Sequence, residues 1–244
     1  MDYLFRDKVS DFIGRELQRS GRESATHVDG FDLLTLLRKT NPYLACIKYK
    51  NSCSAIVDSL FDVGASDVER LIFDDFLKRL AVFISEQKCN GRKSSITGID
   101  IELEREGIRY LIAVKSGKAW GNATQHKKLR DNFQTAVRVL KQNPAVGAIQ
   151  PTLGICYGRF KTVNNGAFLH IGGQSFWELL SYEPDLYMDL IEPIGYRAKQ
   201  FNEEFADNRT HALNRMVREF TERFCREDGS IDWPKIVTLV SKNA

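Results

Sequence analysis

The sequence predicts an α/β fold in which a mixed β-sheet is flanked by helices. Apolar residues recur at helical spacing through the first third of the chain, strand-like periods follow between residues 98 and 171, and helical spacing then returns. We expect one compact domain with a helical N-terminal part (1–66), a core (67–172) and a helical C-terminal part (173–244).

The first third of the chain is predicted to be helical. Residues 3–19 and 31–39 space their apolar side chains at three and four, and Pro42 is expected to end the second helix. The segment Ser66-Asp-Val-Glu69 matches a capping box. It predicts the start of a long amphipathic helix that runs to about Gln87, followed by a polar loop.

The hydrophobic period then changes to that of strands. Apolar and acidic residues alternate from Ile99 to Glu104, which predicts a strand with one apolar and one acidic face. Arg105-Glu-Gly107 supplies a turn, and residues 108–116 form a nearly continuous apolar run typical of a central strand. The elements expected after it are a helix at 124–142, strands at 147–157 and 167–171, and helices at 175–180, 184–191, 197–226 and 233–241.

Composition places the chain among ordinary globular proteins. It is 43% hydrophobic and 27% charged, and its apolar runs are too short to span a bilayer. The N-terminus has no continuous apolar segment, so we expect no secretory signal and a cytoplasmic protein with no membrane contact. Five scattered cysteines without a CxxC pair support neither a zinc ribbon nor a disulfide framework.

Positive charge is concentrated in the middle of the chain. Residues 91–162 carry 13 basic and 5 acidic side chains, although the net charge of the whole chain is only +3. A local basic field of this kind suits a polyanionic partner such as nucleic acid.

The predicted hairpin carries residues suited to phosphodiester hydrolysis. Such chemistry needs a divalent metal, and Mg²⁺ prefers carboxylate oxygens and water, so Asp100 near a strand end is a natural ligand. Lys115, which ends the second strand, is suited to stabilise the phosphate or position the attacking water. Pairing of the two strands is expected to bring these two side chains to one side of the sheet.

These residues resemble a known family. Gly98-Ile-Asp100, a turn, Ala113-Val-Lys115-Ser-Gly, Trp120-Gly-Asn122 and a following helix are similar to the PD-(D/E)xK nucleases, specifically type II restriction endonucleases. The later stretch from Gly172 to Gly195 is similar to a helical segment that follows the core in many of these enzymes. The resemblance implies a restriction-endonuclease-like fold, Asp100 as a metal ligand, Lys115 as the catalytic lysine, and Mg²⁺ as cofactor.

The chain departs from the family pattern at Ala113, which occupies the position of the usual second acid and cannot bind metal. Three explanations remain open. Another acid takes over, with Glu102 the leading candidate and the helix acids Glu69 and Asp75 as further ones. Alternatively, alanine is an engineered replacement that traps uncut DNA, or the protein is a naturally inactive, DNA-binding relative.

Polar and basic residues after the catalytic strand are expected to contact double-stranded DNA through its phosphates, and a later loop through phosphates or base edges. An ordinary turn at Asn165-Gly166 is the alternative for that loop. The candidates after the strand are Lys118, Asn122, Gln125, Lys127 and Lys128, and those in the loop are Arg159, Lys161, Asn164 and Asn165.

We therefore expect a Mg²⁺-dependent type II restriction endonuclease that cuts a short site in double-stranded DNA. A palindromic site favours a homodimer, and a protective DNA methyltransferase is the implied genetic partner. The alternatives are a catalytically silent DNA-binding protein on the same fold and a structure-specific repair or junction nuclease.

Overall fold

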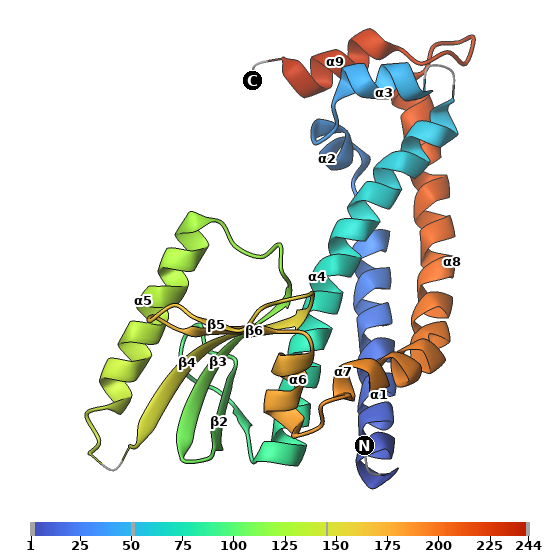
Figure 1. Cartoon of the computed structure of the whole chain (residues 1–244). Coiled ribbons are helices and arrows are strands. Elements are labelled where there is room, and N and C mark those ends of the chain that lie inside the picture. The colour runs from blue at the N-terminus through green and yellow to red at the C-terminus, as the bar shows by residue number, and fades with distance from the viewer. Residues whose placement is uncertain (1–2, 50–51, 145, 243–244) are drawn as a thin grey trace. The chain divides into compact units, whose positions relative to one another are not determined.

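The computed structural model describes residues 3–49, 52–144 and 146–242 (Figure 1). The chain divides into two compact units. Unit 1 consists of Met1–Glu16 and Asp74–Arg197, and unit 2 consists of Leu17–Phe73 and Ala198–Ala244. The predicted catalytic hairpin and the basic segment both belong to unit 1.

Most of the elements are helices, and the three longest, α1, α4 and α8, contribute to both units. The helices are α1 (Tyr3–Asp29), α2 (Leu33–Arg38), α3 (Pro42–Tyr49), α4 (Cys53–Cys89), α5 (Ala123–Leu140), α6 (Gln174–Ser181), α7 (Leu186–Asp189), α8 (Ile191–Phe224) and α9 (Trp233–Ser241). The strands are β1 (Arg92–Lys93), β2 (Ile101–Arg105), β3 (Ile108–Gly117), β4 (Ala148–Tyr157), β5 (Val163–Asn164) and β6 (Leu169–Gly172).

The described strands form one mixed sheet in unit 1, in the order β1-β2-β3-β4-β6-β5. The β3–β4 and β4–β6 pairs are parallel, and the other pairs are antiparallel. Helix α5 covers one face of the sheet, and α6 with the end of α4 lies on the other (Figure 1). The predicted fold class, a mixed sheet flanked by helices, is confirmed.

The β2–β3 hairpin has the predicted form. Ile101 pairs with Ile112, and the turn falls at Glu106 and Gly107, both of which have positive φ. Leu111 to Val114 are fully buried, as expected for the central strand of a sheet covered on both faces. This hairpin fixes the positions of the candidate catalytic residues at its open end.

One prediction for the helical segments was wrong, and one helix was not predicted. Helix α2 ends at Arg38, before Pro42, as expected, but Pro42 also begins the unpredicted helix α3, which fits the tolerance for proline in a first turn. Ser66 lies inside α4, which already begins at Cys53, so the capping-box pattern does not start a helix there. The reason is tertiary, because the apolar face of α4 extends upstream through Ile56 and Phe61 into the core of unit 2.

Unit 2 has a core of its own. Phe61 on α4 and Phe220 on α8 are both fully buried within it, together with side chains of α2 and α9. Across the described residues, no helix combines the length and the apolarity needed to cross a membrane.

Candidate active site

Asp100 stands at the open end of the hairpin, immediately before β2. Its backbone N–H donates to the carbonyl of Ile112 at 2.8 Å, and its carboxylate accepts from the N–H of Val114 at 2.6 Å. These two hydrogen bonds join Asp100 to the backbone of β3. The β2–β3 register, continued by one residue, sets Asp100 across from Ala113.

Lys115 lies on β3, two residues beyond Ala113. Its Nζ is 4.7 Å from the centre of the Trp120 ring, and that ring makes an edge contact with His126. Burial and the nearby charge of Lys78 lower the pKa of Lys115, while the charges of Asp100 and Asp74 oppose this shift. Lys115 is therefore less strongly protonated than a surface lysine and lies within the electrostatic reach of Asp100.

Helix α4 adds charged residues that the sequence reading did not single out. Asp74 and Lys78 are four residues apart, and thus neighbours on one helical face, and both act electrostatically on Lys115. Lys78 and Asp100 also line a groove of about 380 Å³. The groove is lined by Phe12, Glu16, Asp75, Lys78, Arg79, Val82, Phe83, Glu86, Lys93 and Asp100.

The helix acids named from the sequence lie in other surroundings. Asp75 lines the groove, but its carboxylate forms an ion pair with Arg79. Glu69 belongs to unit 2, where burial and then the charge of Asp62 raise its pKa. Asp74, rather than Asp75 or Glu69, is the α4 carboxylate whose charge acts on Lys115.

Ala113 is completely buried. It belongs to the apolar cluster between β3, β4 and α5, which includes Leu111, Phe133 and Leu153. The neighbour that faces it on the hairpin is Asp100. A larger acidic side chain at this position would therefore begin in an apolar layer and extend toward the Asp100 and Lys115 side of the hairpin.

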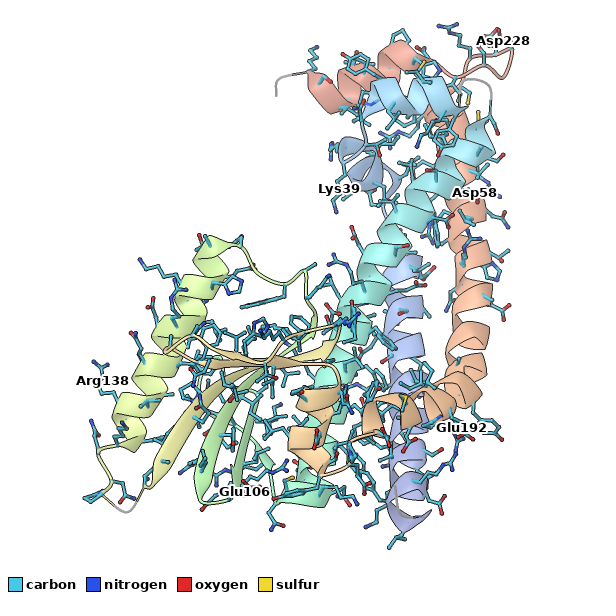
Figure 2. All side chains as sticks on the ribbon, viewed as in Figure 1. Lys39, Asp58, Glu106, Arg138, Glu192 and Asp228 are labelled. Atoms are coloured by element: carbon cyan, nitrogen blue, oxygen red, sulfur yellow. The ribbon has the colours of Figure 1, made fainter. Side chains whose placement is uncertain are left out.

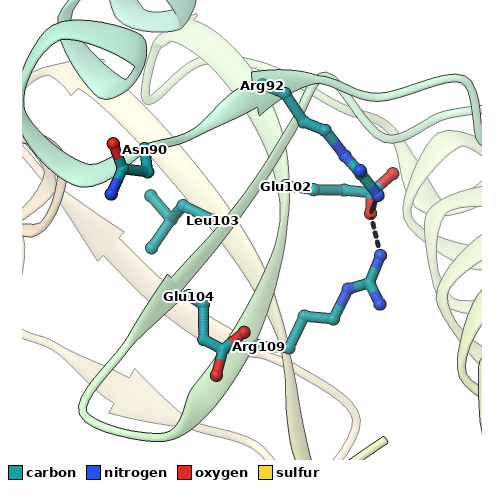
Figure 3. Close-up of a pocket in the computed structure, with 6 residues that line it drawn as sticks. All are labelled: Asn90, Arg92, Glu102, Leu103, Glu104 and Arg109. Carbon is teal, nitrogen blue, oxygen red and sulfur yellow. Dashed lines mark hydrogen bonds and ion pairs between the residues drawn. The ribbon is translucent and has the colours of Figure 1, made fainter.

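Glu102, the leading substitute for the missing acid, is engaged elsewhere. Its side chain is only 6% exposed and accepts hydrogen bonds from Arg92 and Ser94, each at 2.9 Å, and from Arg109 (Figure 3). Burial opposes ionisation, but the bonds from Arg109, Arg92 and Ser94 outweigh it and hold the pKa of Glu102 below its usual value. Both carboxylate oxygens are occupied by contacts that fix β1 to the hairpin.

We expect Glu102→Gln to destabilise the protein by about 1–3 kcal/mol, because the half-buried Arg109 would lose its charged acceptor. The share of Arg92 is small, since that side chain is 65% exposed. Urea unfolding measures the change, with the exposed Glu104→Gln as the matched control. Loss of DNA cleavage with unchanged stability would instead indicate that Glu102 binds the metal.

The candidate DNA contacts after β3 divide into two groups. Lys118, Lys127 and Lys128 are exposed, as is Arg138 further along α5, which points away from the sheet (Figure 2). Asn122 and Gln125 form a capping box, in which the side-chain oxygen of each accepts from the backbone N–H of the other. Their oxygens therefore stabilise the start of α5.

The loop between β4 and β6 shows a similar division. Arg159 and Lys161 are exposed, whereas both asparagines hold the turn. Asn164 Oδ1 accepts from Gly166, and Asn165 Oδ1 accepts from Ala167 and Phe168, each at 3.0 Å. The geometry matches the ordinary-turn alternative for these two asparagines. Arg159 and Lys161 remain the candidate DNA contacts of this loop.

The donor set near Asp100 suits magnesium. No cluster of three or more His, Cys, Asp or Glu side chains that could hold a metal occurs among the described residues. Mg²⁺ does not need one, because it retains several waters and commonly uses one or two carboxylates together with substrate phosphate. Asp100, and Asp74, whose charge also acts on Lys115, carry oxygen donors of the kind required, whereas a structural zinc site would need four nitrogen, sulfur or oxygen ligands.

Comparison with known proteins identifies the family of the chain. The family model of the type II restriction endonuclease EcoO109I matches residues 7–202. No curated protein gives a significant match. Because the family match covers most of the chain and includes the whole Asp100–Lys115 hairpin, the protein belongs to the EcoO109I family of type II restriction endonucleases.

Proposed function

We propose that the protein is a Mg²⁺-dependent, sequence-specific endonuclease that hydrolyses phosphodiester bonds in double-stranded DNA. The observation that carries this proposal is that Asp100, at the open end of the β2–β3 hairpin, acts electrostatically on Lys115 of β3, in a chain of the restriction endonuclease family. The basic helix and loop around that hairpin add the charge that a DNA substrate requires.

Asp100 and Asp74 are the residues we assign to holding Mg²⁺, which when bound would polarise the phosphate and activate water. The hydrogen bond from Val114 orients the Asp100 carboxylate, so little freedom is lost when it binds a ligand. Lys115 is held against Trp120, and its lowered pKa suits a group that orients the attacking water or donates to a phosphate oxygen.

Substrate binding is assigned to the exposed cations of unit 1. Lys118, Lys127 and Lys128 are suited to phosphates near the cut, and Arg159 and Lys161 to a neighbouring stretch of backbone or a base edge. The amide groups of Asn122, Gln125, Asn164 and Asn165 are left as secondary candidates, because their oxygens already serve local turns.

A palindromic recognition site would match a homodimer in which each subunit cuts one strand. The proposal also implies a DNA methyltransferase of the same specificity, to protect the host DNA, and a cytoplasmic location where that DNA lies.

The test is digestion of long, unmethylated DNA with Mg²⁺, compared with the same reaction in EDTA. We expect discrete fragments that depend on the metal. Cutting confined to branched DNA would favour a junction or repair nuclease. Salt-sensitive binding without cleavage at any metal concentration would favour a catalytically silent DNA-binding protein.

A further inference from the structure

Two cysteines that are far apart in the sequence meet in unit 2. Cys53 is the first residue of α4, and Cys225 follows directly after the end of α8. Their Sγ atoms are 2.9 Å apart, although 172 residues separate them in the chain. A disulfide bond is about 2.0 Å long, so less than an ångström of further approach would join the two sulfurs.

The surrounding structure holds both sulfurs in place. Cys225 forms an antiparallel bridge with Ile231 across the turn between α8 and α9. This turn is closed by a 2.8 Å hydrogen bond from Arg226 N to Ser230 O, and it carries Asp228 at its tip (Figure 2). Cys53 Sγ lies 3.9 Å from the carbonyl of Gly229 in the same turn, so the start of α4 packs directly on it.

Packing fixes the pair from the inner side as well. Both cysteines contact the buried apolar cluster of unit 2, which contains Phe224 and Ile231. Both are nevertheless partly exposed, so a small oxidant can reach them. Of the remaining cysteines, Cys89 and Cys156 are buried in unit 1, and Cys46 lies on α3 in unit 2.

We propose that Cys53 and Cys225 form a reversible disulfide that cross-links the start of α4 to the turn between α8 and α9. With glutathione disulfide as the oxidant, one cysteine thiolate attacks a glutathione sulfur and releases one glutathione thiolate. The other cysteine then attacks the mixed disulfide and releases the second glutathione. The two protein thiols are oxidised, one glutathione disulfide is reduced to two glutathione thiols, and the protons of the cysteines pass to the products.

The rate of disulfide formation is expected to depend on pH. Burial, and then the neighbouring Cys53 thiol, raise the pKa of Cys225 to about 12. Cys225 is therefore protonated at neutral pH, and because the thiolate is the reactive form, we expect the cross-link to form faster as the pH rises.

The disulfide would constrain the helices of unit 2. Helix α9, which follows the turn, contacts α2 and α3, so the cross-link would anchor that layer of unit 2 to α4. It would also close a very long loop, and constraint of the unfolded chain grows with loop length. We therefore expect the oxidised protein to melt at a higher temperature than the reduced protein.

The test is incubation of the full chain with glutathione disulfide, followed by non-reducing peptide mapping and thermal melting. We expect a Cys53–Cys225 peptide, a loss of two hydrogen atoms in mass, a raised melting temperature, and reversal of all three by dithiothreitol. Cys53→Ser should abolish these changes, and Cys46→Ser, which alters the uninvolved cysteine of unit 2, should retain them.

The peptide map of the unaltered protein decides the question even if a variant folds poorly. Cys53 and Cys225 both free after oxidation, or joined to other cysteines or to a second chain instead of to each other, would overturn the proposal. A cross-link that leaves the melting temperature unchanged or lowered would overturn its stabilising role.

Discussion

Asp100→Asn is expected to reduce Mg²⁺-dependent DNA cleavage by at least about a hundredfold while leaving the fold intact. The substitution removes the negative charge that would hold the metal. It retains a side-chain oxygen that can accept the hydrogen bond from Val114, so the end of the hairpin is not disturbed. DNA binding without metal should be equal or slightly tighter, because one carboxylate that repels phosphate has been removed.

Single-turnover cleavage with saturating enzyme measures this effect separately from binding. Glu104→Gln is the matched control, since it makes the same chemical change at an exposed position on the same hairpin. Cleavage by Asp100→Asn at the parental rate would show that the catalytic metal is held elsewhere, and the assignment of this hairpin as the active site would then fail.

The hairpin could be predicted from the sequence because its signals are local. Alternating apolar and acidic residues, a glycine turn and a continuous apolar strand lie within twenty residues, and the observed register follows from them. The start of α4 could not be predicted in this way. Its upstream half is stabilised by contacts of Ile56 and Phe61 with side chains on other elements. Because of these contacts the helix continues through Ser66, where the capping-box pattern predicted its start.

The candidate site was accessible from the sequence only in part. Asp100 and Lys115 stand on adjacent strands at a recognisable spacing, but Asp74 and Lys78 come from a helix more than twenty residues upstream, and many acids share that helix. Alternation also placed Glu102 on the same strand face as Asp100, which made Glu102 the leading substitute for the missing acid. Only the contacts of Glu102 with Arg92 and Arg109 show that its charge is used inside the fold.

The same limit explains why the cysteine pair was missed. Cysteine spacing is informative when partners are close in sequence or follow a known framework, and neither applies to Cys53 and Cys225. Their proximity depends on two long helices ending at one place and on the turn that follows α8.

The departure at Ala113 leads to a complementation prediction. If α4 supplies the second carboxylate, Asp74→Asn should lower cleavage by at least about a hundredfold. Adding Ala113→Glu to that variant should restore part of the rate, because position 113 faces Asp100 across the hairpin and precedes Lys115 by two residues. The control is Asp75→Asn, whose carboxylate is paired with Arg79, and it should cleave at close to the parental rate.

A glutamate at position 113 begins in a fully buried apolar layer, so its charge is costly unless a cation compensates it. Ala113→Glu should therefore melt at a lower temperature than the parent without metal, and Mg²⁺ should raise its melting temperature more than that of the parent. Full cleavage by Asp74→Asn would contradict the role given to α4. If the parent is inactive and only Ala113→Glu cleaves DNA, the missing carboxylate belongs at position 113. Asp100, Lys115 and the groove would then form a site that lacks only this carboxylate.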